Sequence, residues 1–130
     1  MFYAPIDVLL STHDIVQPDI VFVRREQLDI VRDQKIEGAP SRVMEILSPS
    51  SRERDLIVTT ALYVRTGVQE YWLVDPERET ILVQALMNGV FTLVPIDNGI
   101  ARSLVVPKCS VALSDIFATP EWNRSREAND

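Results

Sequence analysis

The sequence contains very few of the residues that form disulfides and nitrogen- or sulfur-based metal sites. It has one cysteine, Cys109, and one histidine, His13, among 130 residues. A single cysteine cannot form an internal disulfide, and this fits a reducing compartment. His13 lies in a polar turn and has no second histidine with which to share a metal ion. We therefore exclude an internal disulfide framework and expect a cytoplasmic protein.

Lysine is also scarce, because only Lys35 and Lys108 contribute to the 13 basic residues. The net charge is -6 and the isoelectric point is about 4.7. Bulk charge of this sign does not hold DNA, so contact with nucleic acid requires a local patch or a bound cation. No apolar run reaches the roughly 18 residues of a membrane helix, and we expect no membrane partner.

The overall composition is that of a globular domain. Hydrophobic residues make up 46% and charged residues 25% of the chain, which is enough to build a core and excludes a wholly disordered protein. A length of 130 residues corresponds to one domain. We assign residues 1–118 to this domain and residues 119–130 to a polar C-terminal tail.

Most of the chain has the pattern of strands. Apolar runs and turn signals predict strands at residues 2–10, 15–23, 42–47, 69–75, 80–87, 90–94 and 103–106. Pro18 cannot donate to a ladder, so we expect it at a bulge, at an edge or where its strand begins. Asn88-Gly89 predicts a hairpin between the two strands that flank it. Residues 24–40 are expected to form a long charged connection.

Residues 55–64 are rich in β-branched side chains and are compatible with a strand, but three features favour a helix. Ser50 and Glu53 have the spacing of a capping box, and Gly67 stands where a left-handed helix stop belongs. The third feature is a stripe at helical spacing, made of Leu56, Thr60, Tyr63 and Val64. This helix would be the crossover between two parallel strands. We expect a mixed α/β fold in one layer of sheet, with one crossover helix and a C-terminal hairpin.

Two acidic residues stand out because their chain neighbours are apolar. Glu45 lies within residues 43–47, and Asp19 begins the apolar run of residues 19–23. An unpaired buried carboxylate costs several kcal/mol. Two carboxylates that converge from neighbouring strands repel each other, which makes a divalent cation the natural partner for both. Mg²⁺ takes one or two carboxylates together with water and phosphate oxygens, as in phosphodiester-cleaving sites.

The alternative interpretation of these acids is purely structural. Asp19 would cap a bulge, and Glu45 would pair with Arg42 or Arg54. Spacing alone does not separate this interpretation from the metal site.

A series of short sequence blocks occurs in one order between residues 4 and 117. The blocks are Gln17-Pro18-Asp19, Glu37-Gly38-Ala39-Pro40, Glu45-Ile46-Leu47-Ser48-Pro49-Ser50, Arg54-Asp55-Leu56, Ala61-Leu62-Tyr63, Gly67-Val68 and Glu70-Tyr71-Trp72-Leu73-Val74-Asp75-Pro76. In this order they resemble the Uma-type restriction endonucleases, a family of the PD-(D/E)XK nuclease superfamily. The resemblance covers most of the chain.

The resemblance implies a restriction-endonuclease-like fold, in which an Asp and a Glu on adjacent strands of a central mixed sheet hold Mg²⁺ or Mn²⁺. By position, Pro18-Asp19 matches the "PD" of the motif and residues 45–47 match its "ExK". Asp19 and Glu45 would then be the catalytic and metal-binding residues, and the backbone carbonyl of Ile46 would add a ligand. The implied activity is hydrolysis of phosphodiester bonds in DNA.

Two departures from the family pattern weaken the expected activity. Leu47 stands in place of the superfamily lysine, and the position on the following helix that commonly carries this lysine in the family holds Thr59. An uncharged side chain cannot replace a cation at a developing negative charge. The first helix and strands of the family pattern are also missing, so we expect an N-terminally truncated domain. The apolar surface exposed by that loss would favour a homodimer.

Two hypotheses therefore remain open at the level of the sequence. The first is a Mg²⁺-dependent DNA endonuclease that is weakened by the missing lysine and the missing N-terminal part. The second is a non-catalytic remnant of the nuclease fold that acts as an oligomerising or interaction protein.

Overall fold

The structure is a computed structural model that describes residues 2–3, 6–33, 35–48, 53–106 and 109–117. Its fold is mixed α/β, as the sequence predicts. The strands are β1 (Phe2–Tyr3), β2 (Asp7–Leu9), β3 (Ile15–Val16), β4 (Ile20–Phe22), β5 (Val31–Arg32), β6 (Lys35–Glu37), β7 (Arg42–Ile46), β8 (Glu70–Asp75), β9 (Thr80–Met87), β10 (Val90–Val94), β11 (Ile100–Arg102) and β12 (Ser110–Ala112). The helices are the 3-10 helix η1 (Arg25–Ile30), α1 (Glu53–Thr66) and α2 (Leu113–Phe117).

A six-stranded mixed sheet forms the centre, with the order β1-β4-β7-β8-β9-β10. Strands β7 and β8 are parallel, and α1 is the crossover that connects them, as predicted. The other pairs in this sheet are antiparallel. The domain therefore has the expected central mixed sheet with one crossover helix and a hairpin after it.

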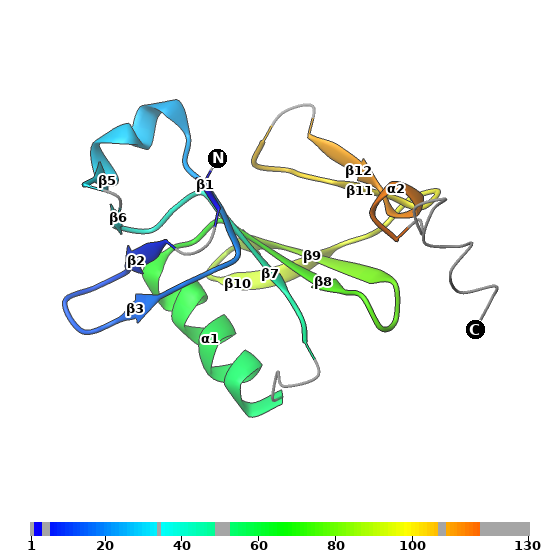
Figure 1. The fold of residues 1–130 in the computed structure, drawn as a ribbon, viewed down its shortest axis with the longest axis horizontal. Coiled ribbons are helices and arrows are strands. Elements are labelled where there is room, and N and C mark those ends of the chain that lie inside the picture. Colours follow the sequence, from blue (N-terminus) through cyan, green and yellow to red (C-terminus); the bar gives the residue numbers. More distant parts are fainter. Residues whose placement is uncertain (1, 4–5, 34, 49–52, 107–108, 118–130) are drawn as a thin grey trace, which may run out of the picture.

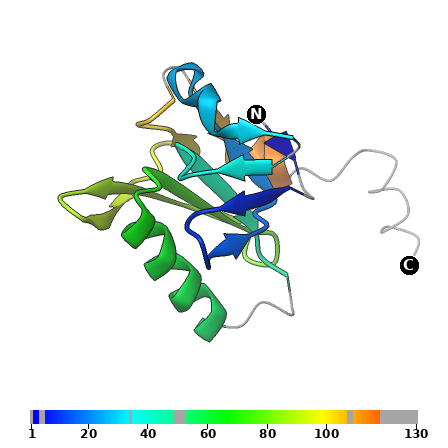
Figure 2. The same cartoon turned by 90° about the vertical axis from the view of Figure 1, so that its left-hand side faces the viewer.

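The two faces of the central sheet are covered by different parts of the chain (Figures 1 and 2). On one face, Val43 and Tyr71 of the sheet pack in a fully buried cluster with Tyr63 of α1. On the other face, Trp72 and Val83 pack with Ala101 of β11 and with partly buried residues of β12 and α2. The alternation of side chains along each strand creates this division.

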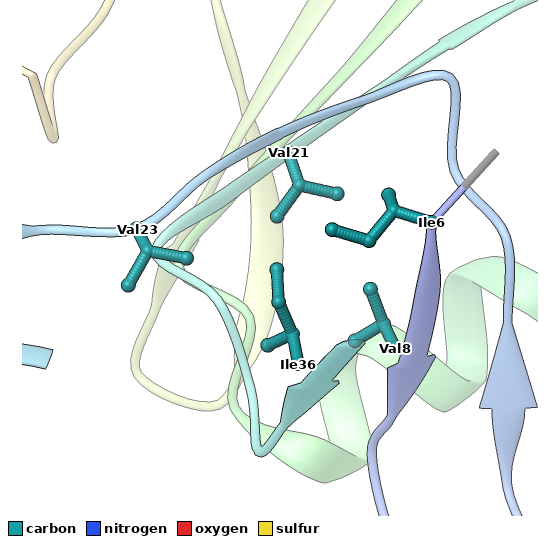
Figure 3. Packing of buried hydrophobic residues seen from close by; sticks show 5 residues of the cluster. All are labelled: Ile6, Val8, Val21, Val23 and Ile36. Carbon is teal, nitrogen blue, oxygen red and sulfur yellow. The ribbon is translucent and has the colours of Figure 1, made fainter. Parts of the chain in front are cut away.

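A second, four-stranded sheet with the order β3-β2-β6-β5 lies beside the first. Ile6, Val8 and Ile36, in or next to β2 and β6, pack with Val21 of β4 and with Val23, which follows that strand. Figure 3 shows this cluster. A third sheet pairs β11 with β12. The expectation of a single layer of sheet is therefore wrong, because short strands on each side of the central sheet provide much of its cover.

Helix α1 ends as its sequence predicts. Gly67 adopts a φ of +89°, which is the left-handed region that favours glycine. The backbone nitrogen of Val68 donates to the carbonyl of Tyr63 at 3.0 Å, which closes the last turn. Ser50 and the side chain of Glu53, which form the predicted capping box at the other end, lie outside the described residues.

The hairpin of β9 and β10 confirms the turn predicted from Asn88-Gly89. Both residues have positive φ, +53° and +80°, as a two-residue type I′ turn requires. Residues 81, 83 and 85 of β9 are buried and alternate with more exposed neighbours. The side chains of these three residues therefore face the core.

The predicted strand at residues 103–106 is wrong, and the reason is the buried carboxylate of Glu70. Its Oε2 accepts hydrogen bonds from the backbone nitrogens of Leu104 at 2.8 Å and Val105 at 3.1 Å. Its Oε1 accepts bonds from Ser103 Oγ and Trp72 Nε1, both at 2.6 Å. Backbone groups that bind a carboxylate are not available to a ladder, so this segment bends around Glu70 and the strands form on either side of it.

Three long segments are also divided more finely than the sequence predicts. Residues 2–10 contribute β1 and β2 to different sheets, and residues 15–23 contribute β3 and β4 to different sheets. Pro18 lies just before β4, where its missing N–H does not interrupt a ladder. The connection of residues 24–40 contains η1, β5 and β6. A change of sheet within a run of apolar residues depends on tertiary packing and leaves no local pattern.

Candidate functional site

Asp19 and Glu45 come together where the start of β4 meets the end of β7. These strands are antiparallel neighbours, with Ile20 opposite Met44. Asp19 is the residue before β4, and Glu45 is the next residue of β7 beyond Met44. The negative charges of both carboxylates also contribute to raising the pKa of one hydroxyl, that of Tyr63. The two acids therefore lie on adjacent strands, where Glu45 binds the hydroxyl of Tyr63 and Asp19 binds the nitrogen of the residue after Glu45.

Asp19 contacts the backbone of β7 directly. Its Oδ2 accepts a hydrogen bond of 2.7 Å from the backbone nitrogen of Ile46. In an antiparallel ladder the N–H and C=O of one residue face the same neighbouring strand. The carbonyl of Ile46 therefore points to the same side as its N–H, which binds Asp19. Pro18, the residue before Asp19, has no N–H to donate to it.

Glu45 is held by two tyrosines from different elements. The hydroxyl of Tyr63, on α1, donates to Oε1 at 2.9 Å. The hydroxyl of Tyr71, on β8, donates to Oε2 at 2.6 Å. Both tyrosines are fully buried, whereas Glu45 is partly exposed. Two charge-assisted hydrogen bonds of this kind reduce the cost of placing a carboxylate against the core.

The two tyrosine hydroxyls remain protonated. Burial is the largest cause and raises the pKa of Tyr63 well above its ordinary value of 10.0, and the negative charge of Glu45 raises it further. Burial and the same carboxylate raise the pKa of Tyr71 in the same direction, while a hydrogen bond with Thr60 partly opposes them. Both hydroxyls therefore stay hydrogen-bond donors to Glu45 at neutral pH.

The donor set at this point of the sheet fits a hard divalent cation. An ionised carboxylate has about four lone-pair sites, so Asp19 and Glu45 keep acceptor capacity beyond their hydrogen bonds. Mg²⁺ requires only one or two carboxylates when water and phosphate oxygens complete its shell. Among the described residues, no group of three or more His, Cys, Asp and Glu side chains could hold a metal ion. The site therefore fits a cation shared with water and substrate and not an all-protein cage.

The structure provides no lysine at the acids within the described residues. Leu47 follows β7 and continues the pairing with β8, since its nitrogen donates to the carbonyl of Val74 at 2.8 Å. Thr59 lies one helical turn before Tyr63, so the two share the face of α1 that points toward Glu45. Lys35 lies on β6 of the second sheet and pairs with Glu37 at 3.3 Å. Lys108 lies outside the described residues.

The suggestion that Glu45 pairs with Arg42 is wrong. Arg42 lies three positions before Glu45 on β7 and points to the other face of the sheet. Its guanidinium carbon lies 5.0 Å from the ring centre of Trp72 and 5.6 Å from that of Phe22. Its Nη1 lies 3.2 Å from Sγ of Cys109. The side chain of Arg54, the other suggested partner, lies outside the described residues.

Sequence reasoning did not identify the second role of Tyr63 and Tyr71. Neither side chain is exposed, so both rings belong to the core. Their hydroxyls, however, reach Glu45. The available signal was the residue type, because a buried tyrosine carries a hydroxyl that requires a partner, whereas phenylalanine does not.

The chain is similar to known proteins in both sequence and fold. The model of the Uma2 family, described as "Putative restriction endonuclease", matches residues 1–114. No curated protein matches the chain. A solved structure from Anabaena variabilis ATCC 29413, described as "a putative nuclease belonging to DUF820", is similar with a TM-score of 0.67 and 19% sequence identity. The similarity covers 86% of this chain and 64% of that one. The chain therefore has a nuclease-type fold and belongs to the Uma2 family of restriction-endonuclease-like proteins.

Proposed function

We propose that this chain carries a site for Mg²⁺ or Mn²⁺ that serves the hydrolysis of phosphodiester bonds in DNA. The ligands would be the carboxylates of Asp19 and Glu45 and the carbonyl oxygen of Ile46. The observation that carries the proposal is that Asp19, just before β4, accepts a hydrogen bond from the backbone nitrogen of Ile46, the residue after Glu45 on the adjacent strand β7. DNA as the substrate follows from the family to which the chain belongs.

Each residue has a defined task in this proposal. When bound, the cation polarises the phosphate and lowers the pKa of the attacking water. Asp19 holds the end of β7 in place through the Ile46 nitrogen, which fixes the separation of the ligands. Glu45 is oriented by the tyrosine hydroxyls. Since the chain is acidic overall, the cation also reduces the repulsion between this site and a phosphate group.

The rate of the reaction is expected to be very low in this chain. Leu47 and Thr59 occupy the two positions at which the family pattern places a lysine, and neither carries a charge. A positive group near the attacking water and the developing phosphate charge contributes substantially to catalysis. Its absence leaves cation binding intact and removes most of the rate enhancement.

Two measurements test the proposal. We expect Mn²⁺ or Mg²⁺ to raise the melting temperature of the wild-type chain and to have no effect on Glu45→Gln. In a plasmid-cleavage assay with Mg²⁺ we expect weak or undetectable cleavage. A chain whose melting temperature does not respond to either cation contradicts the metal site. Rapid cleavage by the wild type that Glu45→Ala abolishes contradicts the low rate but supports the site.

A second candidate function is a non-catalytic protein that associates through an apolar surface. The observation that favours it is an open groove between α1 and the sheet, lined by Leu56, Ile57, Thr60, Ala61, Leu73, Leu82 and Gln84. None of these residues is charged, and Ile57 and Leu82 are exposed. A homodimer in sedimentation velocity that Leu82→Lys converts to a monomer would support this function. A wild-type chain that stays monomeric at high concentration would contradict it.

A further inference from the structure

We propose that Tyr63 and Tyr71 are positioning residues that fix the side chain of Glu45 in the rotamer required for cation binding. This inference rests on the proposed function, since it concerns the same site. It adds a specific task for two buried residues that a core role alone does not explain.

The first argument is geometric. The two hydroxyls reach different oxygens of Glu45, at 2.9 Å for Tyr63 and 2.6 Å for Tyr71. They also come from different elements, a helix and a neighbouring strand. Two donors that approach one carboxylate from separate directions define both its position and the plane of its oxygens. A single donor would leave the group free to rotate.

The second argument is the rigidity of the donors. The rings of Tyr63 and Tyr71 pack edge to face with centres 4.9 Å apart, and the ring of Phe91 lies 6.0 Å from that of Tyr71. Both tyrosine side chains are fully buried. A flexible glutamate is thus held by rings that cannot move without disturbing the core, which is how supporting groups orient metal ligands.

The third argument is that the hydroxyls supply hydrogen bonds without supplying charge. Each hydroxyl donates one hydrogen bond to a different oxygen of Glu45 and brings no positive charge to the site. They do not replace the lysine that the family pattern places nearby. Removal of the hydroxyls should therefore lower the affinity for the cation, whereas the missing lysine lowers the rate of cleavage.

The test measures Mn²⁺ binding to the full chain by titration calorimetry in Tyr63→Phe and Tyr71→Phe. Each variant keeps its ring and loses only the hydroxyl. We expect an affinity lower by about 10-fold, the smaller end of the range for groups that orient metal ligands. Ile81→Val is the control, because it changes packing in the buried cluster on the other face of the sheet and leaves both hydroxyls in place, so we expect wild-type affinity.

A readout that does not require metal separates this inference from the proposed function. Side-chain couplings of Glu45 in NMR spectra are expected to report one rotamer in the wild type and averaging in the Tyr63→Phe, Tyr71→Phe double variant. A wild type that binds no Mn²⁺ contradicts the proposed function, and the couplings then decide the positioning role alone. A single Glu45 rotamer in the double variant, or unchanged Mn²⁺ affinity in both single variants, overturns the inference.

Discussion

Oδ2 of Asp19 lies 2.7 Å from the backbone nitrogen of Ile46, so one acidic side chain connects the start of β4 to the end of β7. The contact gives Asp19 a structural task in addition to its proposed place beside a cation. Replacing Asp19 with asparagine or with alanine distinguishes these two tasks. The amide oxygen of asparagine can still accept the Ile46 hydrogen bond, whereas alanine removes both the acceptor and the charge.

We expect Asp19→Asn to change the free energy of unfolding of the metal-free protein by less than about 0.5 kcal/mol, and Asp19→Ala to lower it by about 1.5 kcal/mol. Neither variant should be stabilised by Mn²⁺, whereas the wild type should gain about 2.7 kcal/mol at 100 times the dissociation constant. Urea denaturation with and without Mn²⁺ measures all three values. Full stabilisation of Asp19→Asn by Mn²⁺ would show that Asp19 is not a ligand.

Thr59→Lys is expected to increase Mg²⁺-dependent plasmid cleavage. The position lies one helical turn before Tyr63, on the face of α1 that points toward Glu45. A lysine there would bring the missing positive charge to the site, and we expect an increase of about 100-fold, the lower end of the contribution of a positioned proton-transfer group. Val58→Lys is the control, since residue 58 is 62% exposed and belongs to a different face of the helix. Equal cleavage by the two variants would point to a general effect of charge.

Glu70→Ala is expected to lower the free energy of unfolding by about 3 kcal/mol. The side chain is fully buried and accepts four hydrogen bonds, from Trp72, Ser103, Leu104 and Val105. Its removal leaves these donors without their acceptor and detaches the bend before β12 from the central sheet. Glu77→Gln is the surface control, for which we expect a change within about 0.5 kcal/mol. A stability equal to that of the wild type would show that water replaces the carboxylate.

The tyrosines predict how stability depends on high pH. In the folded state the pKa values of Tyr63 and Tyr71 lie above the ordinary value of 10.0. Their contribution to the free energy of unfolding is therefore fully present below pH 10. Above that pH the unfolded chain loses protons that the folded chain keeps. The free energy of unfolding should then fall by about 1.4 kcal/mol per pH unit for each tyrosine. Denaturation curves of the wild type and of Tyr63→Phe between pH 9 and 11 measure this slope, which should be shallower in the variant.

Local sequence patterns were sufficient for the elements whose structure depends on near neighbours. The hairpin at Asn88-Gly89, the stop at Gly67 and the crossover helix before β8 all occur as predicted. In each case a turn residue or a helical spacing fixes the backbone within a few positions. The division of residues 2–10 and 15–23 between two sheets depends on contacts with distant strands, and the sequence did not reveal it.

The amino-acid pattern identified Asp19 and Glu45 as acids with apolar chain neighbours and left open whether a cation or other protein groups stabilise them. The family pattern implied that their strands are neighbours. The groups that contact the two acids follow from the tertiary structure. The hydroxyls of Tyr63 and Tyr71 reach Glu45 from 18 and 26 positions away along the chain, and Asp19 reaches Ile46 across 27. Hydrogen-bond partners at such separations depend on how the elements pack, because residue type shows that a polar group needs a partner but not which one it finds.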